Sequence, residues 1–289
     1  KQECEVHLQV LSTTLSHCNP LKDGSKAVWI GAAQFNDQQS FSEIMENADS
    51  ALMAATKQPN GWQFASELSH IHSNTAWKER LNQVLEQQYA DILIQPVMNV
   101  EENIPAYYEA FARFKEKDSG NAIPMTQLIP ASERLNLIPE VDKLVVSLVL
   151  SKLTKSSRDV AINIANASLA SASFRQWLLG LLNQNTALCT QLVFELEDSA
   201  LTHHKDDAIL FCKSLVNLGC KITIEHFGDN LASLAGLRAI QPHFVKISGK
   251  LTKDIHADQD SQLFVSSLLS IARGLSINII AELVENEAE

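Results

Sequence analysis

The chain has 289 residues, of which 45% are hydrophobic, and a formal net charge of −11. This length and composition are sufficient for one large domain or two ordinary ones with a sizeable core, which excludes a disordered chain. Its 23 Lys and Arg residues are scattered singly along an acidic chain. A concentrated basic face is therefore not expected, and nucleic acid is excluded as a predicted direct partner.

The cysteines and the apolar runs bear on the cellular compartment of the protein. Five cysteines are widely spaced and include no C-x-x-C pair, so the sequence predicts neither a disulfide framework nor a zinc site. A reducing cytosol is the simplest setting. The most apolar run, "KLVVSLVLSKL", is far shorter than the roughly 20 residues of a membrane span, and the first residues do not resemble a signal peptide. A membrane anchor outside this stretch remains compatible with the sequence.

The N-terminal part combines one predicted strand and one predicted helix. Residues 28–35, "VWIGAAQF", have the composition of a strand, and residues 40–58 place apolar side chains near helical spacing. Pro59-Asn60-Gly61 ends that helix. A polar stretch then predicts a linker that leads into a further helix. We therefore divide the chain into an N-terminal part over 1–64, a linker over 65–76 and a larger domain over 77–289.

Seven short apolar runs alternate with helical patterns in the larger domain. The runs cover residues 92–98, 107–114, 160–166, 192–197, 221–227, 244–248 and 277–284. The clearest helical patterns cover residues 141–153, 173–184, 205–219 and 260–275. This alternation predicts an α/β fold with a parallel sheet covered by helices, either an open doubly wound sheet or a (β/α)8 barrel. Only about eight residues join the first two runs, too few for a helical crossover, so we expect that pair to be antiparallel.

Each predicted strand carries one polar residue where a buried strand would be apolar. These residues are Gln95, Glu109, Asn163, Glu195, Glu225, Lys246 and Glu282. A single one would be an ordinary buried polar group, but seven near equivalent places converge at the C-terminal mouth of a barrel. Carboxylates together with an amide oxygen and a lysine make a hard-oxygen site suited to Mg2+ or Mn2+.

The segment "YYEAFARF" resembles the signature of the EAL family of cyclic di-GMP phosphodiesterases. Its Glu109-Ala110-Phe111 has Phe where the family has Leu, and Arg113 follows. Further segments resemble family motifs in the same order, namely "QPV", "IPASERLNLI", "AINIANASL", "FELEDS", "EHFGDN", "FVKIS" and "AELVE". The resemblance covers the chain from about residue 77 to its end.

The N-terminal part resembles the last strand and helix of a GGDEF domain, the cyclic di-GMP synthase module that often precedes EAL. The resemblance rests on "WIGAAQF" and "ADSALMAATKQPNGWQF". The nucleotide-binding half would lie upstream of Lys1, so no cyclase site is predicted. At the other end, seven strands are expected before Glu289, and an eighth strand would lie downstream.

The resemblance implies a (β/α)8 TIM-like barrel with an antiparallel first strand pair. Such a barrel binds cyclic di-GMP across its mouth and, in active members, hydrolyses one phosphodiester with two divalent metals. Matching positions imply metal ligands at Glu109, Asn163, Glu195 and Glu225, the last of them vestigial. They imply vestigial catalytic positions at Lys246 and Glu282, and ligand contacts at Gln95, Glu109, Phe111, Arg113 and Glu282.

Three positions depart from the family pattern. Glu225 and His226 replace two adjacent aspartates, and Ser248 replaces the aspartate of Lys-Ile-Asp. Glu is longer than Asp by roughly 1.5 Å, whereas Mg2+ tolerates little departure from octahedral geometry. His226 replaces an anionic oxygen with a nitrogen that is normally neutral, and a structural imidazole is favoured there over a rebuilt transition-metal site. Two-metal hydrolysis is therefore predicted to be absent or very weak.

Three functions remain as alternatives. The first is a non-catalytic cyclic di-GMP receptor similar to the LapD-type membrane receptors, which needs no metal for binding. Such a receptor implies a homodimer, and a cytoplasmic portion of an inner-membrane-anchored protein with possible periplasmic-signalling regions. The second is a weak phosphodiesterase, which would need Mg2+ or Mn2+ for hydrolysis. The third is a ligand-free protein-interaction regulator of the CsrD type.

Overall fold

The computed structural model describes most of the chain, in several stretches. These are residues 2–18, 28–35, 41–56, 58, 60–65, 74–116, 120–153, 158–203, 205–228, 234–284 and 286. The chain forms two compact units, Lys1–Asn82 and Gln83–Glu289. In the sequence, the boundary between the units falls within helix α3 (Asn74–Gln87). The expected linker over 65–76 lies largely outside the described residues.

The N-terminal unit contains a two-stranded parallel sheet with two helices. Its elements before α3 are α1 (Gln2–Cys18), β1 (Ile30–Ala32), α2 (Phe41–Ala55) and β2 (Trp62–Phe64). The predicted helix is confirmed as α2, whereas the strand predicted over 28–35 shortens to three residues. Helix α1 and strand β2 were not predicted. The Trp62 indole donates to Gln9 Oε1 at 2.7 Å and joins α1 to β2.

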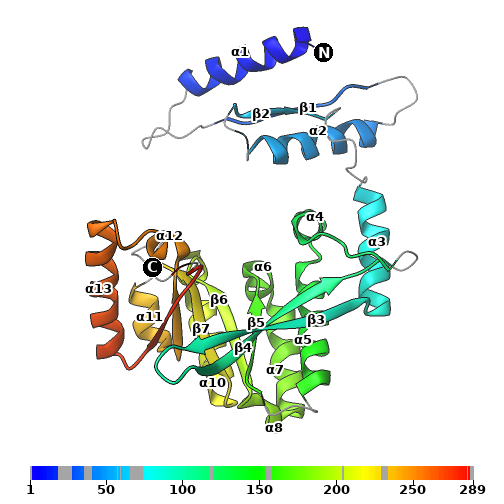
Figure 1. Cartoon of the computed structure of the whole chain (residues 1–289). Coiled ribbons are helices and arrows are strands. Elements are labelled where there is room, and N and C mark those ends of the chain that lie inside the picture. Colours follow the sequence, from blue (N-terminus) through cyan, green and yellow to red (C-terminus); the bar gives the residue numbers. More distant parts are fainter. Residues whose placement is uncertain are drawn as a thin grey trace. The chain divides into compact units, whose positions relative to one another are not determined.

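The larger unit is built on a seven-stranded sheet that curls into a half-barrel (Figure 1). Its strands are β3 (Ala90–Asn99), β4 (Ile104–Phe114), β5 (Val160–Ile164), β6 (Leu192–Glu197), β7 (Lys221–Phe227), β8 (Phe244–Ile247) and β9 (Asn278–Ala281). They are paired in chain order, β3 with β4 antiparallel and all later pairs parallel. The α/β fold and the antiparallel first pair are confirmed.

Ten helices of this unit lie among the described residues. They are α4 (Met125–Arg134), α5 (Ile138–Leu153), α6 (Asn166–Ala170), α7 (Ala172–Gln184), α8 (Thr186–Cys189), α9 (Ala200–His203), α10 (Lys205–Asn217), α11 (Leu234–Ile240), α12 (Gly249–Thr252) and α13 (Gln259–Gly274). Buried side chains of α5, α7 and α10 pack on strand residues such as Ile162, Phe194 and Ile222. Strand side chains alternate between the two faces, so these residues mark the helix-covered face of the sheet.

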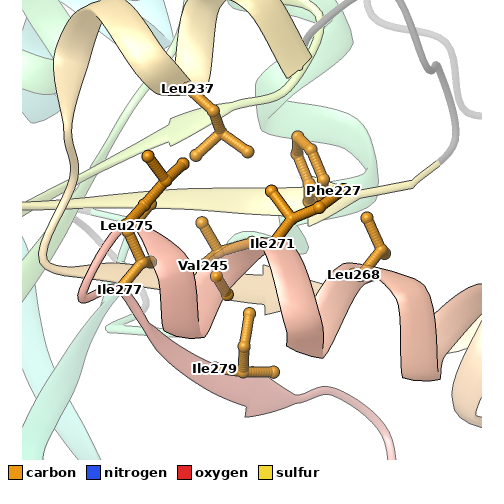
Figure 2. Close-up of a pocket in the computed structure, with 9 residues that line it drawn as sticks. Phe227, Leu237, Val245, Leu268, Ile271, Leu275, Ile277 and Ile279 are labelled. Atoms are coloured by element: carbon orange, nitrogen blue, oxygen red, sulfur yellow. The ribbon is translucent and has the colours of Figure 1, made fainter.

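An apolar pocket lies on the helix-covered face beside α13 (Figure 2). It is lined by aliphatic and aromatic side chains from β7, β8, β9, α11 and α13, including Phe227, Leu237, Val245, Leu268, Ile271 and Ile279. A lining without polar groups offers nothing to orient a ligand or polarise a bond, so this pocket is a gap in core packing. Within the described stretches, no helix is long and apolar enough to cross a membrane.

Candidate functional site

The face of the sheet that is not covered by helices holds a small apolar layer. Most of the predicted polar residues lie near this layer along the chain. The layer consists of Tyr107, Ala161 and Val193, packed against Val97, Phe244 and Ile280. Each of these six lies two residues from a predicted site residue, namely Glu109, Asn163, Glu195, Gln95, Lys246 and Glu282, the last of which follows the end of β9. Because side chains alternate along a strand, the five site residues on strands point to the same face as the layer. The two-residue period of the strands thus positions the site.

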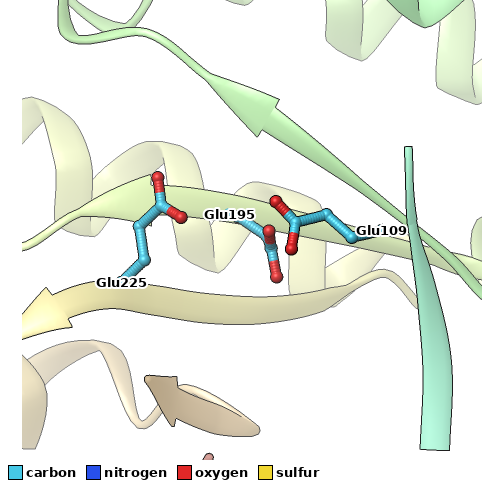
Figure 3. A group of neighbouring side chains, drawn as sticks. All are labelled: Glu109, Glu195 and Glu225. Carbon is cyan, nitrogen blue, oxygen red and sulfur yellow. The ribbon is translucent and has the colours of Figure 1, made fainter. Parts of the chain in front are cut away.

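Three glutamates form a cluster on this face (Figure 3). Ligand oxygens of Glu109 on β4, Glu195 on β6 and Glu225 on β7 all lie within 4.8 Å of one another. Lys246 on β8 joins them: its Nζ lies 2.8 Å from Glu109 Oε2, 2.7 Å from Glu195 Oε2 and 3.8 Å from Glu225 Oε2. With Asn163 on β5, which donates to Glu109, the structure brings together five of the seven predicted polar residues.

Glu195 is the most deeply buried member of the cluster, with 0% of its side chain exposed. Burial raises its pKa to about 7, against the opposing effect of Lys246. The Tyr107 hydroxyl donates to Glu195 Oε1 at 2.9 Å. Burial and the neighbouring Glu195 strongly raise the pKa of Tyr107, so it remains a donor. Sequence reasoning missed this tyrosine, although its place two residues before Glu109 is a usable signal.

Asn163 joins the cluster from β5. Its Nδ2 donates to Glu109 Oε1 at 2.8 Å, while its Oδ1 is buried and has no hydrogen-bond partner among the described residues. A buried acceptor without a donor suits a cation ligand. Together with Glu109 and Glu195, it forms a donor set that fits one hard divalent cation, Mg2+ or Mn2+.

The residue that follows Glu225 on β7 is an imidazole, His226. His226 has a positive φ of 55°, and its side chain is 55% exposed. Its Nδ1 lies 3.0 Å from Glu282 Oε2. Burial lowers the pKa of His226, but the carboxylates of Glu282 and Glu225 outweigh this effect, so the net shift is upward. His226 and Glu282 therefore form a pair of their own instead of joining the carboxylate cluster.

Ser248 also serves another purpose. It is buried at the N-terminus of α12, where its Oγ accepts a hydrogen bond from the Lys250 amide at 3.4 Å. A neutral hydroxyl engaged in helix capping supplies no negative charge. With His226 paired to Glu282 and Ser248 capping α12, neither residue adds a carboxylate to the cluster.

Four of the five predicted ligand-contact residues lie on the β3–β4 hairpin, and the fifth, Glu282, follows β9. Gln95 is exposed and faces Glu109 in the strand register. Arg113 is also exposed, its Nη1 donates to the Ala112 carbonyl at 3.0 Å, and its guanidinium lies 5.8 Å from the Phe111 ring centroid. None of these three side chains is bonded to the carboxylate cluster. Their ligand contacts remain predictions.

A curled parallel sheet with one antiparallel strand and polar residues gathered on its inner face defines a TIM-barrel-like α/β protein. The family model described as "EAL domain" matches residues 78–289. The chain belongs to the EAL domain family.

Similar proteins include two named as cyclic di-GMP phosphodiesterases. PdeF of Escherichia coli is 28% identical over 223 residues, which cover 75% of this chain and 29% of PdeF. PdeB of Shewanella oneidensis is 26% identical over 295 residues, which cover 98% of this chain and 34% of PdeB. The chain thus spans about a third of the length of these curated relatives.

A solved structure of the Vibrio cholerae LapD S helix-GGDEF-EAL protein bound to c-di-GMP matches with a TM-score of 0.78. Its sequence identity is 24%, and the match covers 97% of this chain and 69% of that chain. At this identity the likeness concerns the fold.

Proposed function

We propose that this chain is a catalytically degenerate EAL module that binds cyclic di-GMP without hydrolysing it. The observation that carries the proposal is the pairing of His226 with Glu282 at 3.0 Å, with the imidazole largely exposed. Hydrolysis by two metals needs carboxylates at that place to hold the second cation. The LapD structure with c-di-GMP bound supports the choice of ligand.

The hairpin side chains supply contacts that do not depend on a metal. The exposed Arg113 guanidinium suits a ligand phosphate, since its planar fork can donate two parallel hydrogen bonds. Phe111 offers an apolar ring, and the Gln95 amide can both donate to and accept from a base edge. Glu109 and Glu282 complete the set of expected ligand contacts.

One divalent cation could be held by Glu109, Asn163 and Glu195. When bound, it would polarise a phosphate oxygen and balance its charge. Glu225 lies 3.8 Å from Lys246, and the residue after it in the chain, His226, pairs with Glu282 and supplies no carboxylate for a second cation. In this proposal Glu225, Lys246 and Glu282 are vestiges of a catalytic set.

Two alternatives retain specific support. A weak phosphodiesterase is favoured by the unpartnered Asn163 Oδ1 beside Glu109 and Glu195. A regulator without ligand, of the CsrD type, is disfavoured by the exposed Arg113, which makes no salt bridge in the described part of the chain. Homodimer formation, a GGDEF-like N-terminal part and membrane anchoring of a longer protein belong to the same receptor proposal.

The proposal is tested by calorimetric titration of the protein with cyclic di-GMP, with and without Mg2+. We expect binding in both conditions, and no linear dinucleotide after prolonged incubation with Mg2+ or Mn2+. Arg113→Ala should weaken binding about 10- to 100-fold, the equivalent of a lost charge-assisted hydrogen bond. Arg158→Ala is the matched control. The Arg158 guanidinium lies over the Tyr108 ring, and Tyr108 points to the face of the sheet opposite Glu109 because side chains alternate along β4.

The outcomes separate the three functions. Binding accompanied by turnover would show a phosphodiesterase. Absence of binding at tens of micromolar ligand, which corresponds to a binding free energy weaker than about −6 kcal/mol, would contradict the receptor proposal. The ligand-free regulator would then be the remaining function. If both arginine variants lost the same affinity, Arg113 would have no specific contact with the ligand.

A further inference from the structure

Lys246 occupies the centre of the carboxylate cluster. From β8 its ammonium reaches Glu109 on β4 at 2.8 Å, Glu195 on β6 at 2.7 Å and Glu225 on β7 at 3.8 Å. The Lys246 side chain is only 5% exposed. A buried ammonium thus links carboxylates from three other strands of the sheet.

Protein donors already satisfy both oxygens of the two glutamates nearest to Lys246. Glu195 Oε1 accepts from the Tyr107 hydroxyl at 2.9 Å, and its Oε2 accepts from Lys246. Glu109 Oε1 accepts from the Asn163 amide at 2.8 Å, and its Oε2 accepts from Lys246. A buried ionised carboxylate needs such donors or a cation, and here it has them without a metal.

The ammonium keeps its charge in this environment. Its Nζ lies within hydrogen-bond distance of Glu109 and Glu195 and 3.8 Å from Glu225, and carboxylates this close favour the charged form of a lysine. The cluster thus has a cation supplied by the chain itself. An ammonium placed in this way balances charge much as a bound metal ion would.

We propose that the Lys246 ammonium is the resident cation of the Glu109, Glu195 and Glu225 cluster. In this role Lys246 is a positioning residue: it holds the carboxylates of β4, β6 and β7 together in the absence of a divalent ion. The inference concerns the cluster itself and does not depend on whether cyclic di-GMP binds.

The test is replacement of the cation. Lys246→Met removes the ammonium and leaves Glu109 Oε2 and Glu195 Oε2 without their donor, beside Asn163 Oδ1. Thermal unfolding of the whole chain is followed in EDTA and in about 5 mM Mn2+, because an ion that binds only the folded state raises the melting temperature. The control is Lys221→Met, since Lys221 pairs with Asp159 at 2.6 Å and touches none of the cluster.

We expect Mn2+ to raise the melting temperature of the wild-type chain less than that of Lys246→Met, because Glu109 and Glu195 must give up their bonds to Lys246 before they can hold a divalent cation. Lys246→Met should melt roughly 10 °C lower in EDTA, because it leaves buried carboxylates without a counter-charge, and Mn2+ should recover several degrees. Lys221→Met should lose less and show no recovery. The proposal is overturned if Mn2+ stabilises the wild type as much as Lys246→Met, or if it rescues the two lysine variants equally.

A double variant covers the case in which Lys246→Met does not fold. Glu195→Gln combined with Lys246→Met removes one negative and one positive charge from the cluster. We expect the double variant to fold, and its melting temperature to lie closer to that of the wild type than the melting temperature of Lys246→Met does. A double variant that is as unstable as Lys246→Met would also overturn the proposal. No dinucleotide is present in these experiments, so their failure leaves the proposed function untouched.

Discussion

Asp142 on α5 fixes the turn that follows β5 at the edge of the candidate site. Its Oδ2 accepts a hydrogen bond from the Ala165 amide at 3.0 Å, two residues beyond Asn163. Ala165 is the N-cap of α6 and makes no side-chain capping bond, so Asp142 supplies an acceptor from another helix. Burial raises the pKa of Asp142 to about 6, although the Ser168 hydroxyl and the Ala165 amide oppose the shift.

This raised pKa predicts a pH dependence of stability. Between about pH 4 and pH 6 the folded chain holds a proton on Asp142 that the unfolded chain has released, so the free energy of unfolding falls as pH rises through this window. Asp142→Asn cannot ionise and keeps the acceptor oxygen. Above pH 6 it should be more stable than the wild type by at most about 3 kcal/mol, and near pH 4 it should be equal.

Urea denaturation across this pH range measures the difference. Asp142→Ala, which loses the acceptor for the Ala165 amide, should be less stable than Asp142→Asn at every pH. Parallel pH profiles for the wild type and Asp142→Asn would show that Asp142 does not titrate in this window.

The packing of α2 on β1 depends on a single glycine. A side chain at Gly31 would overlap the Ala48 carbonyl oxygen and the Leu52 backbone of α2. The obstacle is backbone, which cannot rotate aside as a side chain can. Close approach of helix and strand in the N-terminal unit therefore requires glycine at this position.

Gly31→Ala should destabilise the N-terminal unit by about 3 kcal/mol, because α2 has to move away from β1. The control is Gly180→Ala on α7, where a β-carbon meets nothing within 4 Å and where alanine should stabilise the helix by about 0.5 to 1 kcal/mol. Amide hydrogen exchange in β1 and β2 measures the first effect, and chemical denaturation measures both. Unchanged protection of those amides in Gly31→Ala would contradict the close packing.

At the scale of the whole molecule, the net charge of the chain affects the rate at which a charged ligand associates with it. The chain carries a net charge of −11, and three of its carboxylates gather on the inner face of the sheet. Cyclic di-GMP carries two phosphate charges, so long-range electrostatics repels it even where Arg113 attracts it locally.

If the chain binds this ligand, the association rate should rise with ionic strength. Screening shortens the range of repulsion from about 30 Å at 0.01 M salt to about 8 Å at 0.15 M. Stopped-flow measurement over this range should show a several-fold increase in the association rate constant. A rate that falls with added salt would show that the cations around the site dominate the encounter.

The sequence by itself determined the seven strands, the antiparallel first pair and a polar residue on six of the strands, with Glu282 just past the end of the seventh. These features depend on local chain chemistry: apolar runs of strand length, a connection too short for a crossover and the two-residue period of a strand. That period was enough to place Glu109, Asn163, Glu195, Glu225 and Lys246 on one face.

Only the tertiary structure decided which of those side chains meet. Tyr107 reaches Glu195 from β4 to β6, Lys246 bonds across from β8, and Asp142 caps a turn from another helix. His226 has a positive φ that the surrounding sequence does not predict, and it pairs with Glu282, 56 residues away. Contacts over such separations depend on the curl of the sheet and the docking of helices, and no local pattern encodes them.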